Sequence, residues 1–466
     1  MIVASFWDLK HNEEHIALIE NSFSPVTYGE FKYKVEIFKE QLPRLRKKQL
    51  GLILCSNRVT TLIAYIAGLQ LSDALLLLDE KINDKFLKNI IERYEPDWIY
   101  TSKSFQGHDD YRLHYKSNDY EIWCRVSSID TTEIYPDLAL LLSTSGTTGS
   151  SKFVRLSYKN IQSNAEAIVA YLQLNETERA ITTLPMQYSY GLSVINSHLL
   201  AGGTLLLTDD SILSKDFWSF FKKNKATSLA GVPYIYQMLH RLRFDRMDLP
   251  SLRYFTQAGG RLSPNLVRYF NKVAKEKGWR FYVMYGQTEA TARISYVPPE
   301  RLSEKESSIG IPIPNGKLFL DAETSELIYE GPNVMLGYAH SRSDLAKGDE
   351  LFGRLHTGDI AAMDEDGYFY IKGRMKRFIK LFGLRLNLDE IEKQIEQHFS
   401  TNVACVGDDD KLYVITEEET KIDEIKLYIR DLYKLHPSAF TVKRIAAFPR
   451  LANGKINYTE LKDLMV

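Results

Sequence analysis

The chain has 466 residues, of which 44% are hydrophobic and 26% are charged, and its formal net charge is -1. One hydrophobic core rarely serves so many residues, so two or three domains of an ordinary globular protein are expected. The near-zero charge excludes the broad positive surface that a nucleic-acid partner requires.

Short apolar runs alternate with helical patterns over roughly the first 285 residues. Runs this apolar are typical of strands that are buried on both faces, and the helical patterns between them, such as residues 264–278, favour parallel α/β layers. The predicted strands are residues 51–56, 74–79, 97–102, 138–143, 204–208, 227–232 and 281–285.

The pattern changes twice in the last third of the chain. From about residue 310, short alternating segments separated by Gly and Pro predict an antiparallel β region. After residues 373–378, a helix at 388–399, a strand, a helix at 422–436 and another strand predict a small α+β unit. We therefore expect an α/β fold with two domains. Residues 1–374 would form a core of layered α/β subdomains with the antiparallel region, and residues 375–466 a small mobile domain.

The segment LLSTSGTTGSSKF at residues 141–153 runs from a predicted buried strand into a turn rich in Ser, Thr and Gly. Glycines let the backbone approach a phosphate, hydroxyl and amide groups donate to it, and Lys152 adds a positive charge. It is not the P-loop of kinases, because Lys152 is followed by Phe153 and no Gly precedes it. Taken alone, the segment is either a phosphate loop or a turn without a ligand.

Two further loops follow predicted strands, at the edge where open α/β sheets bind ligands. In YGQTEAT (285–291), Tyr285 can cover a nucleobase and the Glu289 carboxylate can hold Mg²⁺ against phosphate oxygens. In AGGRL (258–262), Gly259 and Gly260 let a flat ligand lie against bare backbone. Packing turns without a ligand are the alternative for both loops.

Three polar residues stand out in the last quarter of the chain. Asp359 ends HTGD (356–359), which precedes a hairpin with its turn at 364–367, and it can either accept two hydrogen bonds from a ribose diol or cap the turn. Arg374 closes the same β region and can reach ribose or phosphate. Lys455 stands on the Asn-Gly turn of LANGKIN (451–457), which alone indicates only a surface lysine on a hairpin.

Together and in this order, the motifs resemble those of the adenylate-forming superfamily, which contains acyl-CoA synthetases, the adenylation domains of peptide synthetases and firefly luciferase. The resemblance spans nearly the whole chain and implies an AMP-forming acid–thiol ligase. Such an enzyme uses ATP to convert a carboxylic acid to an acyl-AMP, releases pyrophosphate, and transfers the acyl group to a pantetheine thiol. The matching segments are TYGEF (27–31), STSGTTGSSK (143–152), LPMQYSYGLSV (184–194), GVP (231–233), AGGRL, YGQTE, SIGIPIPN (308–315), HTGD, GRMKRFIKLFG (373–383) and NGK (453–455).

The resemblance also implies roles for individual residues. Thr288 would contact the α-phosphate, Glu289 would hold Mg²⁺, and Lys455 would bridge the substrate carboxylate and phosphate, so these three form the implied catalytic set. The small domain would rotate about a hinge at Lys376 and present a face with Gly383 to the thiol. The implied nucleotide-binding residues are Thr144, Ser145, Gly146, Thr147, Thr148, Gly149 and Lys152 around the phosphates, Gly259, Gly260, Tyr285 and Gly286 around the adenine, and Asp359 and Arg374 at the ribose.

The chain departs from the family pattern at a few positions. Ser151 and Phe153 replace the Pro and the second Gly of the usual phosphate loop, Arg261 stands where many relatives carry Glu or Ala, and Leu388 replaces a common Pro after the hinge. These changes bear on local geometry. None of them removes a charged or catalytic position.

The identity of the acid is less defined. Relatives that activate amino acids usually carry an Asp in the LPMQYSYGLSV segment, which holds the ammonium group, and here Gly191 stands at that place. Because a buried ammonium without a carboxylate is costly, we expect an acid without an α-amino group, such as a fatty, aryl or small hydroxy acid. The residues that either line its pocket or belong to the core are Tyr188, Tyr190, His198 and Tyr234.

The acceptor of the acyl group is expected to be CoA or the phosphopantetheine of a carrier protein. An amino-acid or aryl-acid adenylase that loads a carrier is the second interpretation, and a non-catalytic nucleotide-binding relative is a remote third. The cysteines Cys55, Cys124 and Cys405 form no CxxC pair, so neither a disulfide framework nor a zinc site is indicated. The N-terminal residues show no signal-peptide pattern and no apolar run is long enough to span a membrane, so we expect a cytoplasmic protein.

Overall fold

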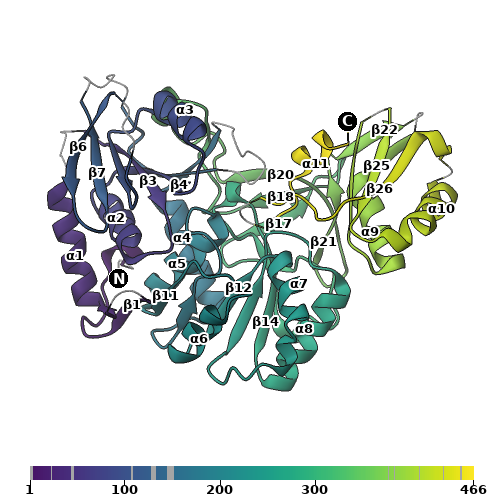
Figure 1. Cartoon of the computed structure of the whole chain (residues 1–466), viewed down its shortest axis with the longest axis horizontal. Coiled ribbons are helices and arrows are strands. Elements are labelled where there is room, and N and C mark those ends of the chain that lie inside the picture. The colour runs from purple at the N-terminus through teal and green to yellow at the C-terminus, as the bar shows by residue number, and fades with distance from the viewer. Residues whose placement is uncertain are drawn as a thin grey trace.

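The computed structural model describes residues 4–21, 24–42, 47–105, 109–126, 133–143, 152–375, 377–381, 384–408, 410–433, 435–451 and 454–465. Two large mixed sheets and the helices around them form the main body, and the segments after residue 374 gather in a lobe at one end (Figure 1). Within these described ranges, no helix is both long and apolar enough to cross a bilayer.

The first large sheet is built from the N-terminal third of the chain. Its central strands β3, β4 and β8 are parallel and buried along nearly their whole length, as their Leu-rich sequences predict. The strand order is β19 (Gly337–Ala339), β9 (Phe153–Ser157), β8 (Leu138–Ser143), β4 (Ala74–Asp79), β3 (Leu50–Cys55), β5 (Trp98–Thr101), β7 (Glu121–Arg125), β6 (Tyr111–Lys116).

The second large sheet holds most of the candidate site loops at the carboxyl ends of its strands. Strands β10 to β14 are parallel to one another, so the loops that follow β12, β13 and β14 meet at one edge. The strand order is β16 (Ile311–Pro312), β15 (Ser295–Val297), β14 (Arg280–Tyr285), β13 (Tyr254–Gln257), β12 (Ser228–Gly231), β10 (Arg179–Ile181), β11 (Thr204–Leu207), β1 (Ile16–Glu20), β2 (Val26–Thr27).

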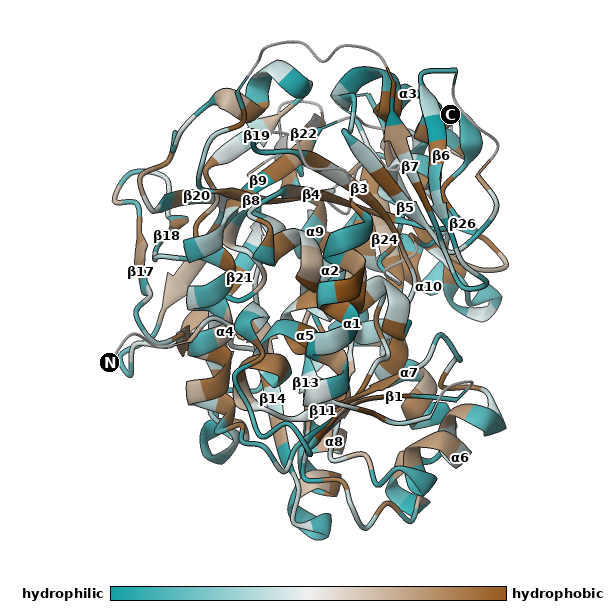
Figure 2. Ribbon diagram, turned by 90° about the vertical axis from the view of Figure 1, so that its left-hand side faces the viewer, coloured by the Kyte–Doolittle hydropathy of each residue, from teal (hydrophilic) through white to brown (hydrophobic). Residues whose placement is uncertain are grey.

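Helices fill the space between the two sheets and cover their outer faces. Figure 2 shows α2 (Val59–Gln70), α4 (Tyr158–Leu172) and α5 (Ser189–Ala201) between the sheets, and one hydrophobic cluster joins residues of both sheets through them. The TYGEF motif is a helix start, because Thr27 and Glu30 form a reciprocal capping box on α1. Helix α1 (Tyr28–Gln41) packs its buried face into the same cluster. The outer helices are α3 (Asp84–Tyr94), α6 (Lys215–Lys223), α7 (Pro233–Arg241) and α8 (Pro264–Lys277).

An antiparallel sheet follows, as predicted, from strands β17 (Lys317–Leu320), β18 (Glu326–Glu330), β20 (Arg354–Met363) and β21 (Phe369–Arg374). HTGD lies inside β20 and not before the hairpin, because the strand continues through Asp359 across an irregularity between Ile360 and Ala361. Asp359 therefore pairs directly with Arg374 on the neighbouring strand.

The C-terminal lobe has a hydrophobic cluster of its own, which joins strands β22 (Phe378–Leu381), β23 (Leu384–Asn387), β24 (Val403–Gly407), β25 (Leu412–Thr416) and β26 (Phe440–Arg444) to helices α9 (Leu388–Phe399) and α10 (Ile422–Tyr433). Helix α11 (Tyr458–Asp463) covers the other face of this sheet. The prediction of an α/β fold with a small α+β unit at the C-terminus is confirmed. The domain boundary at residues 374/375 stays a prediction.

A buried ion pair ties the first large sheet to the segment that follows β19. Arg342 donates to both carboxylate oxygens of Asp97, at 3.3 and 3.2 Å, and both side chains are almost fully buried. Asp97→Ala would leave the guanidinium buried without its counter-charge. We expect the free energy of unfolding to fall by about 3–5 kcal/mol, measured by chemical denaturation.

The matched control is Glu330→Ala, which removes the partner of Arg354 from an ion pair with exposed side chains. This change should cost no more than about 1 kcal/mol, since water screens an exposed pair. Equal losses in the two variants would contradict the role given to the Asp97–Arg342 pair.

Candidate active site

The loop after β14 places three of the candidate residues at the edge of the second sheet. Thr288 and Glu289 form a single helical turn (Thr288–Ala290), and the Thr288 hydroxyl lies 3.2 Å from that of Ser189 at the start of α5. Gly286 is needed here because a β-carbon at this position would lie 1.7 Å from the carbonyl oxygen of Ala292. The tight loop thus turns the Thr288–Glu289 backbone back toward the sheet.

Asp359, the candidate ribose ligand, is buried and already hydrogen-bonded within the protein. It accepts hydrogen bonds from the Tyr285 hydroxyl at 2.5 Å, the Gln287 amide at 3.1 Å and Arg374 Nε at 3.0 Å. A carboxylate offers about four acceptor positions, so a ribose hydroxyl must take the remaining one or displace a partner. Burial raises the pKa of Tyr285 well above its ordinary value, and the Asp359 charge raises it further.

Tyr338 links Glu289 to Lys152, the residue at the end of the predicted phosphate loop. Lys152 Nζ lies 3.4 Å from the centroid of the Tyr338 ring, and the Tyr338 hydroxyl donates to Glu289 Oε1 at 2.9 Å. Tyr338 reaches this place because β19 pairs with β9, the strand that begins directly after Lys152. Residues 144–149, predicted to surround the phosphates, lie outside the described residues. Sequence analysis did not single out Tyr338, since only strand pairing brings it beside residue 152.

Gly259 and Gly260, after β13, form a bare stretch of backbone next to the C-terminal lobe. Gly259 has φ +82°, and a β-carbon there would lie 2.6 Å from the Tyr188 hydroxyl and 3.8 Å from Lys455 Cε. Gly260 has ordinary backbone angles and borders the ring of Pro233. The Gly259 backbone, Tyr188 and Lys455 therefore converge on one point.

Lys455 arrives at this point on a hairpin of the C-terminal lobe that packs on the start of α7. Arg450 pairs with Ile456 across the hairpin, and its guanidinium lies 4.7 Å over the Tyr234 ring. The pKa of Lys455 is lowered to about 8, mainly by burial and also by the Arg374 charge, and the charges of Glu289 and Asp359 offset part of this effect. The predicted catalytic lysine and the predicted Mg²⁺ and ribose carboxylates thus influence one another electrostatically.

The aromatic residues predicted to line the acid pocket have different environments. The Tyr188 ring lies 6.0 Å from Lys455 Nζ and 6.3 Å from the Tyr190 ring, whose hydroxyl bonds to Thr256. His198 is a core residue, because its ring bonds to the Val194 carbonyl and the Tyr254 hydroxyl and burial lowers its pKa. Gly191 contributes backbone only, since a β-carbon there would lie 2.3 Å from the carbonyl oxygen of Pro185.

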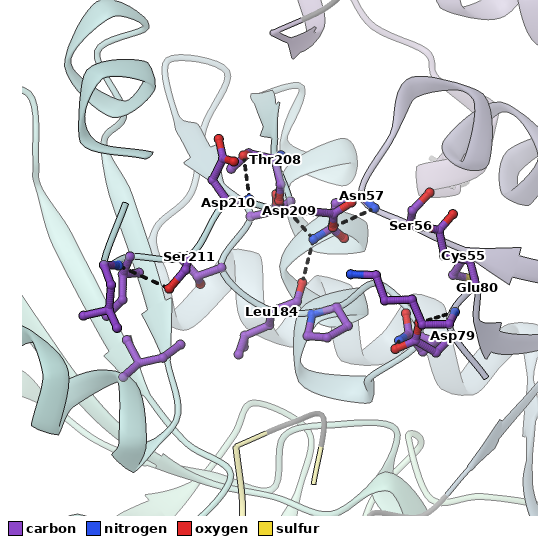
Figure 3. Close-up of a pocket in the computed structure, with 18 of the residues that line it drawn as sticks. Cys55, Ser56, Asn57, Asp79, Glu80, Leu184, Thr208, Asp209, Asp210 and Ser211 are labelled. Carbon is purple, nitrogen blue, oxygen red and sulfur yellow. Dashed lines mark hydrogen bonds between the residues drawn. The ribbon is translucent and has the colours of Figure 1, made fainter. Parts of the chain in front are cut away.

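A cavity of about 380 Å³ opens at the seam between the two large sheets (Figure 3). Tyr234 is part of its lining. Asn57 spans it, donating to the carbonyls of Leu184 and Thr208. Its wall carries several carboxylates, and burial raises the pKa of Asp209. The wall carries more carboxylates than cations, which disfavours a triphosphate there; its charged residues are Asp79, Glu80, Lys81, Asp209 and Asp210.

Two predicted positions on the C-terminal side, Lys376 and Gly383, lie outside the described residues. Their neighbour Arg377 forms ion pairs with Asp389 and Glu392, and the Arg374 backbone donates to Asp389 at 2.9 Å. These contacts anchor the start of the C-terminal lobe to α9.

The chain was next compared with known proteins. A family model described as AMP-binding enzyme matches residues 6–339. The chain belongs to the AMP-binding enzyme family. A long-chain-fatty-acid–CoA ligase of Salmonella typhimurium is 30% identical over 413 residues, which cover 81% of this chain and 68% of the relative. An oxalate–CoA ligase of Arabidopsis thaliana is 31% identical over 345 residues, which cover 69% of this chain and 66% of the relative.

Solved structures show the same fold. O-succinylbenzoate CoA synthetase of Bacillus subtilis, solved with ATP and a magnesium ion, superposes with a TM-score of 0.77 at 23% identity and covers 99% of this chain and 100% of its own. The prediction that this AMP-binding enzyme is an AMP-forming ligase of the adenylate-forming superfamily is thereby confirmed. The roles of single residues stay proposals.

Gly259→Ala tests whether the bare backbone beside Lys455 is needed. The substitution places a β-carbon at a positive φ and within 2.6 Å of the Tyr188 hydroxyl, so it should cost about 1–3 kcal/mol of stability and displace Tyr188. Measured by thermal unfolding and ATP–pyrophosphate exchange, the variant should lose at least roughly tenfold in exchange rate, since small misplacements in a site have large effects.

Gly278→Ala, at the end of α8 and away from the site, is the control, because Gly278 also has a positive φ (+71°) but its β-carbon would meet nothing within 4 Å. It should keep most of the exchange activity. If both variants behave alike, the close approach at Gly259 is not what the site requires.

Proposed function

We propose that this AMP-binding enzyme activates a carboxylic acid without an α-amino group, such as a fatty, aryl or small hydroxy acid, and transfers it to the thiol of CoA. The reaction class, ATP-dependent formation of an acyl-AMP followed by thioester formation, is that of the CoA ligases to which the chain is related. The observation that carries the residue assignments is the position of Lys455: a lysine from the C-terminal lobe lies against Gly259 and Tyr188 within electrostatic reach of Glu289, Asp359 and Arg374.

Attack of a carboxylate on the α-phosphate brings two anions together, so positive charge must be held where they meet. Lys455 would bridge the attacking carboxylate and the phosphate, and Lys152 would act on the departing pyrophosphate. Thr288 would donate to an α-phosphate oxygen from the turn after β14, because Ser189 holds its hydroxyl in place. The preorganised cations would stabilise the transition state more than the separated substrates.

Glu289 would hold the Mg²⁺ ion. Among the described residues, its carboxylate accepts one side-chain hydrogen bond, from Tyr338, and no group of three or more His, Cys, Asp or Glu side chains gathers to form a metal site. A single carboxylate fits Mg²⁺, which is usually bound by one or two carboxylates together with substrate phosphates. When bound, the ion would neutralise the triphosphate and orient it for in-line displacement. The B. subtilis relative was solved with ATP and magnesium, which supports this assignment.

The nucleoside would lie between β14 and the antiparallel sheet. Tyr285 is held by Asp359 and Gln287, and this fixes its ring as one wall of an adenine site. Asp359 and Arg374 would bind the ribose, with Gly259 and Gly260 bordering the base. The phosphate loop of residues 144–149 would close over the β- and γ-phosphates.

CoA is the proposed acceptor because the related enzymes are named as CoA ligases. Loading of a phosphopantetheinyl carrier protein is the second candidate. Incubation of the acyl-AMP with CoA or with a loaded carrier separates the two: the true acceptor yields a thioester at a rate that matches acid activation. We place this reaction in the cytoplasm, as the sequence predicts.

Lys455→Ala tests the central assignment. Without the bridging charge, we expect acid-dependent ATP–pyrophosphate exchange to fall by roughly 10²–10³, which corresponds to about 3–4 kcal/mol of transition-state stabilisation. Lys462→Ala, which removes an exposed lysine from the same lobe, is the control and should exchange at the wild-type rate. Wild-type exchange in Lys455→Ala would refute the assignment.

The pH dependence of the reaction offers an independent test. Lys455 carries its charge below its pKa of about 8, so kcat/KM for exchange should decline as the pH rises through this value. Lys455→Arg keeps a charge at all accessible pH values. The variant should therefore lack this decline, even if its maximal rate is lower. A wild-type profile that stays flat from pH 7 to pH 9.5 would show that the charge of Lys455 is not required.

A further inference from the structure

Arg293 is a buried cation that has no counter-charge among the described residues. It follows the Thr288–Glu289 turn, and its side chain is only 1% exposed. The guanidinium carbon lies 4.0 Å over the Tyr190 ring, and Nη1 lies 3.2 Å from the sulfur of Met284. Its Nε has no hydrogen-bond partner in the described structure, although the side chain also hydrogen-bonds to Tyr190.

Two other deeply buried arginines, Arg155 and Arg342, each have a carboxylate partner. Arg155 forms an ion pair with Glu350 and also donates to backbone carbonyls. Arg342 forms a bidentate pair with Asp97. Because a buried charge without a partner costs several kcal/mol, proteins rarely retain one unless a ligand supplies the partner. A thioether and an aromatic face are weak compensation for a guanidinium with five N–H donors.

The position of Arg293 connects it to the reacting centre. Tyr190, on which it stacks, lies beside Tyr188, and Tyr188 borders Gly259 and Lys455. Ser189, between the two tyrosines in sequence, contacts Thr288. Arg293 thus lies on the acid side of the site, separated from the catalytic lysine by two aromatic rings that can flank the body of a substrate.

We propose that the acid substrate carries a second carboxylate and that Arg293 binds it. In this arrangement Lys455 holds the carboxylate that is activated, and Arg293 pairs with the one that is not. The guanidinium fork suits a carboxylate, which it can bind through two parallel hydrogen bonds. The inference rests on the proposed function and refines its substrate to a dicarboxylic acid whose linker packs against the edge-to-face pair of Tyr188 and Tyr190.

The test is ATP–pyrophosphate exchange with matched acids that differ only in the second carboxylate: succinate and butanoate, glutarate and pentanoate, adipate and hexanoate, phthalate and benzoate. For at least one pair, wild-type kcat/KM should favour the diacid by roughly 100-fold, because a site built around a polar partner strongly rejects an analogue that lacks it. In Arg293→Met, kcat/KM for that diacid should fall by a similar factor, while the monoacid should be used as well as or better than before.

Arg293→Lys is the conservative control and should retain part of the preference, since it keeps the charge without the fork. A purely structural Arg293 would instead lower the rates for both members of each pair together. Equal use of diacids and monoacids by the wild type, or preference for monoacids, overturns the inference but leaves the proposed function intact, and this result does not depend on how well a variant folds. If the wild type shows exchange with none of the acids, both the inference and the proposed function are rejected.

Discussion

The structure depends on one contact between distant parts of the chain: the hairpin that carries Lys455 lies on the loops after β12 and β13. Gly454 has φ +80° and fits against Val232, and Lys455 extends past Gly259 toward Tyr188. Neither half forms the site alone. The main body supplies the carboxylates Glu289 and Asp359, whereas the C-terminal lobe supplies the lysine between them. Any movement of that lobe would therefore assemble or dismantle the charge arrangement that we propose for acid activation.

The rest of the fold holds this edge of the second sheet in position. Parallel strands deliver the loops after β12, β13 and β14 to one edge, and the glycines in those loops admit backbone and side chains where a β-carbon would collide. Strand β19, pairing with β9, brings Tyr338 between Lys152 and Glu289. The antiparallel sheet sets Asp359 opposite Arg374. The candidate nucleotide-binding residues thus come from three sheets. The hairpin that carries Lys455 covers the edge where these residues meet.

Much of the fold is predictable from sequence, because strands buried on both faces have no polar positions to obscure them: β4 and β8 fall at the predicted residues. The order of the family motifs likewise predicts which loops meet. Sequence analysis did not identify Tyr338 or Arg293, since their importance comes from packing between segments and not from any local pattern. The lack of space at Gly191 was equally hidden, because only the packing of α5 shows that no side chain fits there.

The reduced pKa of Lys455 links nucleotide binding to the arrangement of the C-terminal lobe. Docking the hairpin withdraws the lysine from water and brings it toward Arg374, and both effects disfavour its charged form. A triphosphate and a substrate carboxylate in the site would add negative charge around Lys455 and offset that cost. Anions bound to the main body should therefore favour the docked hairpin. The size of this effect is the difference in free energy between the interactions of Lys455 with the anions in the docked hairpin and those in the undocked hairpin. Once pyrophosphate leaves, this difference shrinks. The same electrostatics that favour docking during acid activation would thus weaken it afterwards, when the rotation implied by the family resemblance would withdraw the lysine and admit the thiol.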